Sequence, residues 1–147
     1  MKTTHKTFGF KTESEFHIID LTDQVLDFIK ESGVKNGLVN VQTLHTTTGL
    51  LLNENEPLLF EDIKQHFEDA APKERIYRHD NMTVRTVNVC EDECANGHSH
   101  IKASHLCATL TLNLLNGKLQ LGRWQRILFI ELDRPRSREV QVMVMGE

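Results

Sequence analysis

The pair Asn116-Gly117 constrains the fold more than any other feature of the sequence. It separates two apolar segments, Thr109–Leu115 and Lys118–Leu121. Asn-Gly in this position favours a type I′ turn, because both central residues of that turn need positive φ. The sequence therefore predicts a tight antiparallel hairpin in the second half of the chain, which argues against a doubly wound parallel sheet.

The periodicity of apolar residues predicts the other elements of the fold. Helices are expected from a cap at Thr22 to a stop at Gly33, from Pro57 onward, and over His98–Cys107. Since strands and helices do not alternate regularly, we expect an α+β sheet sandwich of about seven or more mostly antiparallel strands with two to three helices. Period-two patterns predict further strands at Thr3–Thr12, Phe16–Leu21, Gly37–His45, Met82–Val89, Arg126–Asp133 and Glu139–Met145.

Size and charge exclude several classes of protein. The 147 residues fit one domain, residues 1–147, and are too few for a (β/α)₈ barrel. The 17 Lys and Arg residues against 21 Asp and Glu residues give a net charge of −4, so neither nucleic acid nor an acidic membrane is an expected partner. No apolar run is long enough to span a membrane, the N-terminus lacks an export signal, and three cysteines are an odd number. We expect a cytoplasmic protein with reduced thiols.

Histidine is the residue type that points most directly to chemistry. Of eight histidines, His98, His100 and His105 lie within eight residues. Neutral imidazoles are common zinc ligands, and an H-x-H pair directs both rings to the same side if the backbone is extended. On a helix the two rings would diverge, and the alternative is a polar loop whose imidazoles only form hydrogen bonds. His105 is expected on a helix face rather than at a metal.

The cysteines offer a second, weaker interpretation. Cys90, Cys94, His98 and His100 form a C-x₃-C-x₃-H-x-H pattern, which supplies four potential ligands for a closed structural zinc. The spacing is not that of ordinary zinc fingers, so we favour the histidines alone. Cys107 is interpreted as a small buried apolar residue.

A run of threonines follows one predicted strand. Thr46, Thr47 and Thr48 come directly after His45 and precede a helix, so that hydroxyl and backbone N–H groups can converge on an anion. The sequence lacks a Walker motif, and simple strand propensity is an equally good interpretation of the run. Glu54, a few residues further on, is a candidate acid or base.

Lys102 and Ser104 follow the histidine pair. A lysine beside a metal can hold phosphate as a point charge, whereas the alternative is an ordinary exposed helix lysine. The basic turn Arg134–Arg138 is interpreted as solvated surface or a subunit contact, because no aromatic residues are interleaved with it.

Three segments together resemble one family. They are His45–Gly49 with Asn53-Glu54, Asn96–Ser104, and Asn116–Gln125, which ends in a G-x₄-G-x-W-Q motif. Their order and spacing are similar to the YjbQ-like family of secondary thiamine-phosphate synthases, over nearly the whole chain. Arg123 stands where that family usually has threonine.

The resemblance implies two packed sheets, a homotrimer with sites near the subunit interfaces, and a pocket where the His-Thr-Thr and Asn-Gly-His-x-His segments meet. His45 and His100 match recurrent histidines of the family, His79 falls at another position where histidine is frequent, and His98 stands where other members have aspartate. The implied cofactor is a divalent metal, zinc or, with a diphosphate substrate, magnesium. Its expected ligands are His45, His79, His98 and His100.

The activity implied by the resemblance joins hydroxymethylpyrimidine diphosphate to thiazole phosphate. Lys102 and Thr46–Thr48 would neutralise the departing diphosphate, and Glu54 would be the acid or base. One alternative is a metal-dependent hydrolase of a small phosphorylated or damaged metabolite, and another is a non-catalytic trimer that binds an anion or metal. Further substrate contacts are expected from Asn96, Ser104, Trp124 and Gln125.

Overall fold

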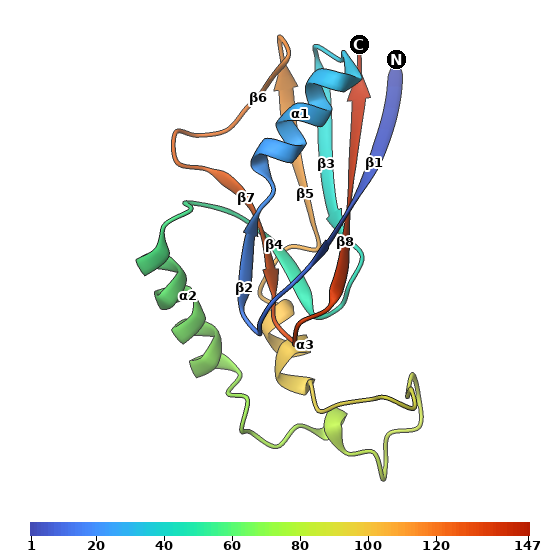
Figure 1. The fold of residues 1–147 in the computed structure, drawn as a ribbon, viewed down its shortest axis with the longest axis vertical. Helices are drawn as coiled ribbons and strands as arrows, with labels where there is room; N and C mark the ends of the chain where they lie inside the picture. Colours follow the sequence, from blue (N-terminus) through green and yellow to red (C-terminus); the bar gives the residue numbers. More distant parts are fainter.

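Two antiparallel sheets make up most of the computed structural model, which describes residues 1–147 (Figure 1). The larger sheet has the strand order β1-β8-β3-β5-β6, and the smaller has the order β2-β7-β4. The α+β class predicted from the sequence is therefore confirmed. The strands are β1 (Lys2–Lys11), β2 (His17–Asp20), β3 (Gly37–Thr43), β4 (Thr48–Asn53), β5 (Thr109–Leu115), β6 (Lys118–Leu119), β7 (Arg126–Glu131) and β8 (Ser137–Gly146).

Three α-helices and one 3₁₀ turn connect the strands: α1 (Thr22–Ser32), α2 (Pro57–Ala70), η1 (Arg78–Asp80) and α3 (Gly97–Ala103). Gly33 ends α1 with φ of 71°, as expected of a left-handed helix terminus. The predicted capping role of Thr22 is wrong, because Thr22 is already helical and its hydroxyl accepts a hydrogen bond from the Ile127 N–H. None of the helices combines the length and apolar character that crossing a membrane requires.

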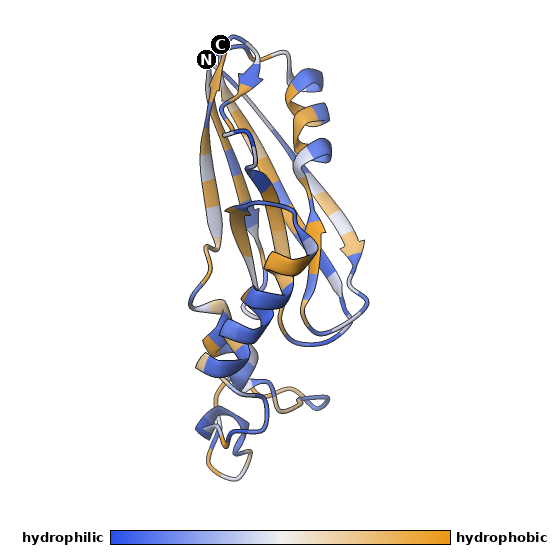
Figure 2. Cartoon of the chain, turned by 90° about the vertical axis from the view of Figure 1, so that its left-hand side faces the viewer, coloured by the Kyte–Doolittle hydropathy of each residue, from blue (hydrophilic) through white to orange (hydrophobic).

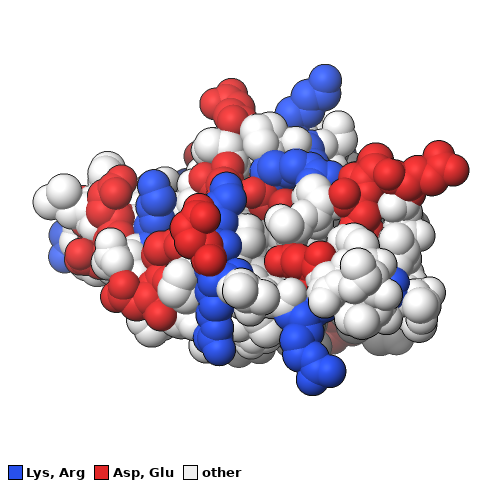
Figure 3. All heavy atoms as spheres, turned by 90° about the horizontal axis from the view of Figure 1, so that it is seen from below, with Lys and Arg blue, Asp and Glu red and all other residues white.

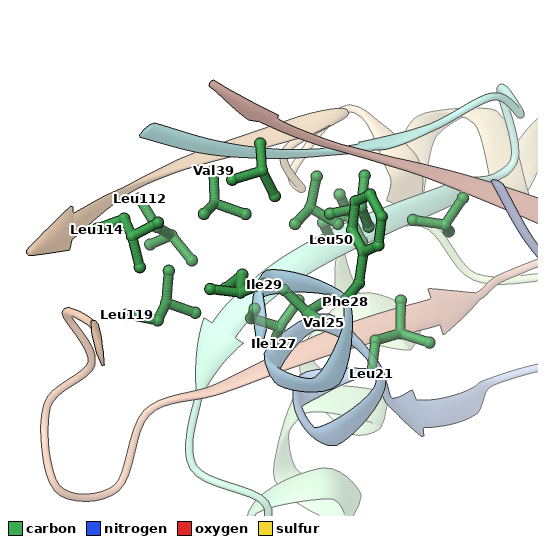
Figure 4. Close-up of a cluster of buried hydrophobic side chains, with 14 of the residues drawn as sticks. Leu21, Val25, Phe28, Ile29, Val39, Leu50, Leu112, Leu114, Leu119 and Ile127 are labelled. Atoms are coloured by element: carbon green, nitrogen blue, oxygen red, sulfur yellow. The ribbon is translucent and has the colours of Figure 1, made fainter. Parts of the chain in front are cut away.

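The main core lies between the large sheet on one side and α1 with the small sheet on the other. Val25, Phe28 and Ile29 of α1 point toward strand side chains such as Val39 and Leu112 (Figure 4). Hydrophobic and hydrophilic residues alternate along these strands (Figure 2), so that one face of the large sheet is buried and the other is open.

A second, smaller cluster covers the opposite face of the small sheet. Phe67 of α2 packs there with Ile130 and Leu132, and Ala103 and Leu106 lie against the same cluster. β7 is consequently buried on both faces. α3 packs against β4, and its Ser99 hydroxyl donates to the Leu132 carbonyl just after β7.

The hairpin predicted from Asn116-Gly117 is present between β5 and β6. The φ angles of Asn116 and Gly117 are 52° and 73°, the positive values that the turn requires.

The predicted strand at Met82–Val89 is wrong. Residues 71–96 run outside both sheets, with η1 and several turns but no strand (Figure 1). Arg85 satisfies the backbone here instead of a neighbouring strand, because its guanidinium donates to the carbonyl oxygens of His79, Val87 and Asn88. The alternation of apolar and polar residues was misleading here, because a strand also needs a partner strand and none lies beside this segment.

Two further expectations need correction. The threonine run does not lead directly into a helix, because Thr48 begins strand β4, which pairs with β7. Cys107 is exposed rather than buried, since it follows α3 at a bend where only its backbone pairs, with Leu50.

Candidate functional site

The helical geometry of α3 separates the two histidines of the H-x-H pair. Successive residues of an α-helix are rotated by about 100°, so the side chains of residues two apart point to nearly opposite sides. His98 is buried, and its Nδ1 lies 3.7 Å from Glu15 Oε1. The His100 ring instead lies 4.6 Å from the His79 ring. The pair therefore does not form a chelate.

Lys102 lies on the same side of α3 as His98. Its Nζ donates to Glu68 Oε2 at 2.6 Å and lies 3.8 Å from Glu15 Oε1. It lines a separate cavity of about 300 Å³, away from His100. The charge of Lys102 is thus matched by carboxylates and is not directed at the other histidines.

His79 and His100 are brought together by a carboxylate. Asp80 of η1 accepts hydrogen bonds from the N–H groups of Asn96 and Gly97 at the start of α3, at 3.0 and 2.8 Å. A Cβ on Gly97 would lie 2.6 Å from Tyr77 Cβ, so the close approach of the two segments requires glycine. The contact fixes η1 against α3 and places the two imidazoles side by side.

These imidazoles border a polar cavity of about 440 Å³, which we call the histidine cavity. Its walls come from the β3–β4 connection, η1 and the loop after it, the start of α3, and the β7–β8 connection. Only one of its lining residues is apolar. The lining residues are Leu44, His45, Thr46, Thr47, His79, Arg85, Asn88, Glu93, Asn96, His100, Arg136 and Arg138.

A second hollow, of about 500 Å³, adjoins the histidine cavity and shares Leu44, His45, Thr46 and His100 with it. Ala103, Leu106 and Ala108 make its wall more apolar, and Ser104 also lines it. The combined space has a polar end and a less polar end, which suits a ligand with a charged group and a ring.

Arg138 and the threonines are largely occupied by contacts within the chain. Arg138 forms a buried ion pair with Glu131, and its Nη2 also donates to Thr47 Oγ1 at 3.0 Å. Thr48 Oγ1 lies 2.6 Å from Thr43 Oγ1 and donates to the His45 carbonyl. Of the threonine run, only the exposed Thr46 faces the cavity with a hydroxyl that has no partner. Of the two remaining arginines, Arg85 is paired with Glu93, so Arg136 supplies most of the free positive charge of the wall. Basic and acidic side chains are interspersed over the face of the molecule seen from below (Figure 3).

Three buried side-chain atoms of the protein lack a hydrogen-bond partner: His79 Nε2, Asn96 Oδ1 and Asp133 Oδ2. His79 and Asn96 line the histidine cavity, and Asp133 lies beside it, with Oδ2 3.6 Å from Arg136 Nε. Leaving such atoms unpaired costs free energy, so each calls for an explanation. An imidazole nitrogen, an amide oxygen and a carboxylate oxygen all have lone pairs that suit a divalent cation.

The electrostatics favour neutral imidazoles at this site. Burial lowers the pKa of His100, the neighbouring His79 adds to the effect, and Asp133 opposes it. Burial also lowers the pKa of His45, with Arg138 as the next cause. His45 Nε2 accepts a hydrogen bond from the Glu139 N–H at 2.9 Å, so the lone pair of this nitrogen is already in use. A neutral imidazole is the form that binds metals.

Within the chain, no group of three or more His, Cys, Asp or Glu side chains lies close enough together to hold a metal ion. His79 and His100 form a pair, whereas His45 and His98 are engaged elsewhere.

Three predicted site residues lie at the other end of the small sheet. Thr48 pairs with Glu131 and Asn53 pairs with Arg126, so Glu54 is about 20 Å along β4 from the histidine cavity. Trp124 is 60% exposed, with Arg123 over its ring, and Gln125 accepts the Gly122 N–H. Neither Glu54 nor the Trp-Gln pair reaches the cavity of the same chain.

Sequence reasoning missed Asp133, Arg85 and Glu93. It was also wrong to interpret all of Arg134–Arg138 as solvated surface or a subunit contact, because Arg138 is buried against Glu131 and Arg136 lines the histidine cavity. Asp133 comes two residues after the end of the buried strand β7, and a polar residue near a strand end was an available signal. No sequence signal indicated Arg85 or Glu93, because their segment was interpreted as a strand followed by an acidic loop.

The fold and the site together define a class: an α+β protein of two antiparallel sheets with a polar, histidine-lined cavity where their connections meet. The chain belongs to the UPF0047 protein YjbQ-like family, whose match covers residues 6–147.

Relatives of known sequence and structure agree with this assignment. A UPF0047 protein of Methanothermobacter thermautotrophicus is 35% identical over 100% of this chain and 95% of its own length. The UPF0047 protein YugU of Bacillus subtilis is 33% identical over 96% of this chain and 98% of its own. The crystal structure of hypothetical protein APE1520 from Aeropyrum pernix has a TM-score of 0.85 at 33% identity, with 100% of both chains covered.

Proposed function

We propose that the histidine cavity binds a divalent metal together with a small phosphorylated substrate, and that the chain is a secondary thiamine-phosphate synthase-like enzyme. The observation that carries the metal and phosphate part is the set of unpartnered buried atoms beside His100, in a cavity whose wall is polar and partly cationic. The choice of reaction rests on the family resemblance.

His79, His100, Asn96 and Asp133 would hold the metal. Two imidazoles favour zinc, whereas the amide and carboxylate oxygens also suit magnesium carried in by a diphosphate. Because these side chains do not form a preassembled cluster, binding requires small movements or further ligands from the substrate. His45 joins the set only if its Nε2 releases the Glu139 N–H.

The proposed reaction is attack of a thiazole nitrogen on the activated methylene of hydroxymethylpyrimidine diphosphate. The new C–N bond forms as the C–O bond to diphosphate breaks, and the diphosphate leaves with the electron pair. Arg136, half-buried at the cavity wall, stabilises the negative charge of the leaving group. The hollow beside Leu106 and Ala108 orients the rings and excludes water.

We also propose that the protein is a cytoplasmic homotrimer whose subunits meet through the open face of the large sheet. The outward residues of β1, β3, β5 and β8 carry almost no charge, with Lys11 and Glu139 as the exceptions, and depletion of charge is a feature of interface cores. A second copy on this face could bring its own Glu54, Trp124 or Gln125 toward the histidine cavity. The outward uncharged residues are Thr3, His5, Thr7, Gly9, Leu38, Asn40, Gln42, Thr109, Thr111, Asn113, Leu115, Ser137, Gln141, Met143 and Met145.

Two measurements test the proposal. The first is the zinc content per chain after reconstitution of wild type, His100→Ala and the matched control His105→Ala, whose exposed ring lies outside the cavity. We expect loss of zinc in His100→Ala alone, and equal zinc in both variants would contradict the metal site.

The second is incubation with hydroxymethylpyrimidine diphosphate and thiazole phosphate, with thiamine phosphate and diphosphate as the expected products. Release of inorganic phosphate without ring joining would replace the synthase with a metal-dependent hydrolase of phosphorylated metabolites. Binding of either compound without turnover would replace it with a non-catalytic anion- or metal-binding protein.

A further inference from the structure

Cys90 and Cys94 lie on either side of a turn that borders the histidine cavity. The Glu93 N–H donates to the Cys90 carbonyl at 3.2 Å, so the chain reverses direction between the two cysteines. Cys90 is exposed, Cys94 is half-buried, and neither is in a disulfide.

Both cysteines border one small cavity of about 240 Å³, which we call the thiol cavity. Its other lining residues are Asp92, Glu93, Asn96, Arg134 and Arg136. Cysteines four residues apart across a tight turn, both lining one cavity, are candidates for a disulfide, whose closure needs Cα atoms about 4.4–6.8 Å apart.

The cations of the thiol cavity indicate which reagent fits. Arg134 forms no ion pair in the structure, and Arg136 has only the 3.6 Å contact with Asp133. Guanidinium groups with spare donors recognise carboxylates. Of the two carboxylates that line the cavity, Glu93 is paired with Arg85, so the two guanidinium groups outnumber the one remaining carboxylate, Asp92. A small disulfide that carries carboxylates, of the glutathione disulfide class, therefore matches this cavity better than a neutral one.

We propose that Cys90 and Cys94 form a redox site that reacts with a small carboxylate-bearing disulfide. The exposed Cys90 attacks one sulfur of that disulfide, its S–S bond breaks, and one half leaves as a thiol that takes the proton lost by Cys90. Cys94 then attacks Cys90 in the mixed disulfide and releases the second half as a thiol. The two protein thiols are oxidised, and one small disulfide is reduced to two thiols.

The turn connects the redox site with the histidine cavity. Glu93 Oε2 accepts a hydrogen bond from the Cys90 N–H at 3.4 Å, and Glu93 Oε1 accepts one from Arg85 Nη1 at 3.0 Å. Arg85 in turn holds the loop that forms one wall of the histidine cavity. Both cavities are lined by Glu93, Asn96 and Arg136. Closing the disulfide would shift this wall, as expected of a reversible thiol switch in a reducing compartment.

The test uses the full chain, reduced and then incubated with glutathione disulfide in a glutathione buffer. Alkylation and peptide mapping locate each modified thiol. We expect the loss of two thiols per chain and a peptide cross-linked between Cys90 and Cys94. The Cys107→Ser variant should behave as wild type, and Cys94→Ser should stop at a glutathione adduct on Cys90. Equal adducts on all three cysteines of wild type, without a cross-link, would overturn the proposal, as would no reaction.

The role of the guanidinium group is tested separately with Arg134→Gln. The variant should react about fivefold more slowly with glutathione disulfide, and at the wild-type rate with uncharged hydroxyethyl disulfide. Equal rates of wild type and variant with both reagents would remove the carboxylate preference from the proposal. This experiment does not depend on any activity of the histidine cavity.

Discussion

Arg138 and Glu131 form a two-point ion pair that is almost completely buried beneath the histidine cavity. The Arg138 Nε and Nη2 atoms each lie 2.6 Å from a different carboxylate oxygen, and the side chains are 4% and 0% exposed. Glu131 also accepts from the Thr12 hydroxyl and the N–H groups of Leu132 and Asp133. The pair therefore connects β1, β7 and β8 at the point where the β7–β8 connection supplies the wall of the cavity.

Removing the charge of Glu131 should destabilise the fold strongly. In Glu131→Gln, Arg138 stays buried without a counter-charge, and loss of one partner of a buried pair costs about 3–5 kcal/mol. Urea unfolding measures the free energy. The control is Glu31→Gln, which removes the exposed pair with Lys6 and should cost less than about 1 kcal/mol. Similar losses in both variants would show that the buried pair has no special role.

The stability of the metal-free protein should fall as the pH drops below the usual histidine pKa of about 6.5. Burial lowers the pKa of His45, His98 and His100 in the folded state, with charges of neighbouring groups as secondary causes. The unfolded chain therefore takes up protons first, and its protonation favours unfolding. Above that pH the same groups are neutral in both states and contribute no pH dependence.

Unfolding by urea at pH values from about 7.5 to 5.5 measures this dependence. His100→Gln should show a shallower decline than wild type, because a group that takes up protons later in the folded state is removed. A wild-type stability that stays constant or rises toward pH 5.5 would contradict the expectation.

The sequence predicted the fold better than the site, for identifiable reasons. The Asn116-Gly117 turn and the helix stop at Gly33 depend on positive φ, which is a local property of the chain, and both are confirmed. The strand expected at Met82–Val89 required a partner strand, and alternation carries no information about partners.

The candidate site depends on contacts that no local pattern encodes. His79 and His100 meet because Asp80 binds the start of α3, and Glu54 is separated from them by the length of β4. The helical state of residues 97–103 separated His98 from His100, although their spacing suggested a pair. Residue types thus indicated the chemistry, whereas tertiary contacts decided which residues take part.

Replacing Gly117 by alanine should destabilise the protein by about 1 kcal/mol, because an L-residue with a Cβ is strained at φ of 73°. The new Cβ would also lie 3.3 Å from Lys35 Cδ. Gly9→Ala is the matched control, since Gly9 has no positive φ and no atom within 4 Å of the added Cβ. Thermal unfolding should show a clear decrease for Gly117→Ala alone, and equal midpoints for both variants would contradict the turn geometry.

Asp133→Asn should separate stability from metal binding. The Asp133 Oδ2 atom is buried without a hydrogen-bond partner and has only a 3.6 Å contact with the partly exposed Arg136 Nε. Neutralising the carboxylate therefore removes a desolvation cost and a weak ion pair together, and should leave the metal-free protein about as stable as wild type. Zinc affinity should fall by about tenfold or more, because a charged oxygen ligand is lost beside His79 and His100. Calorimetric titration with zinc, together with urea unfolding in the presence of a chelator, measures both quantities. A variant that loses stability without zinc but binds the metal as wild type does would make Asp133 a structural residue and remove it from the proposed ligand set.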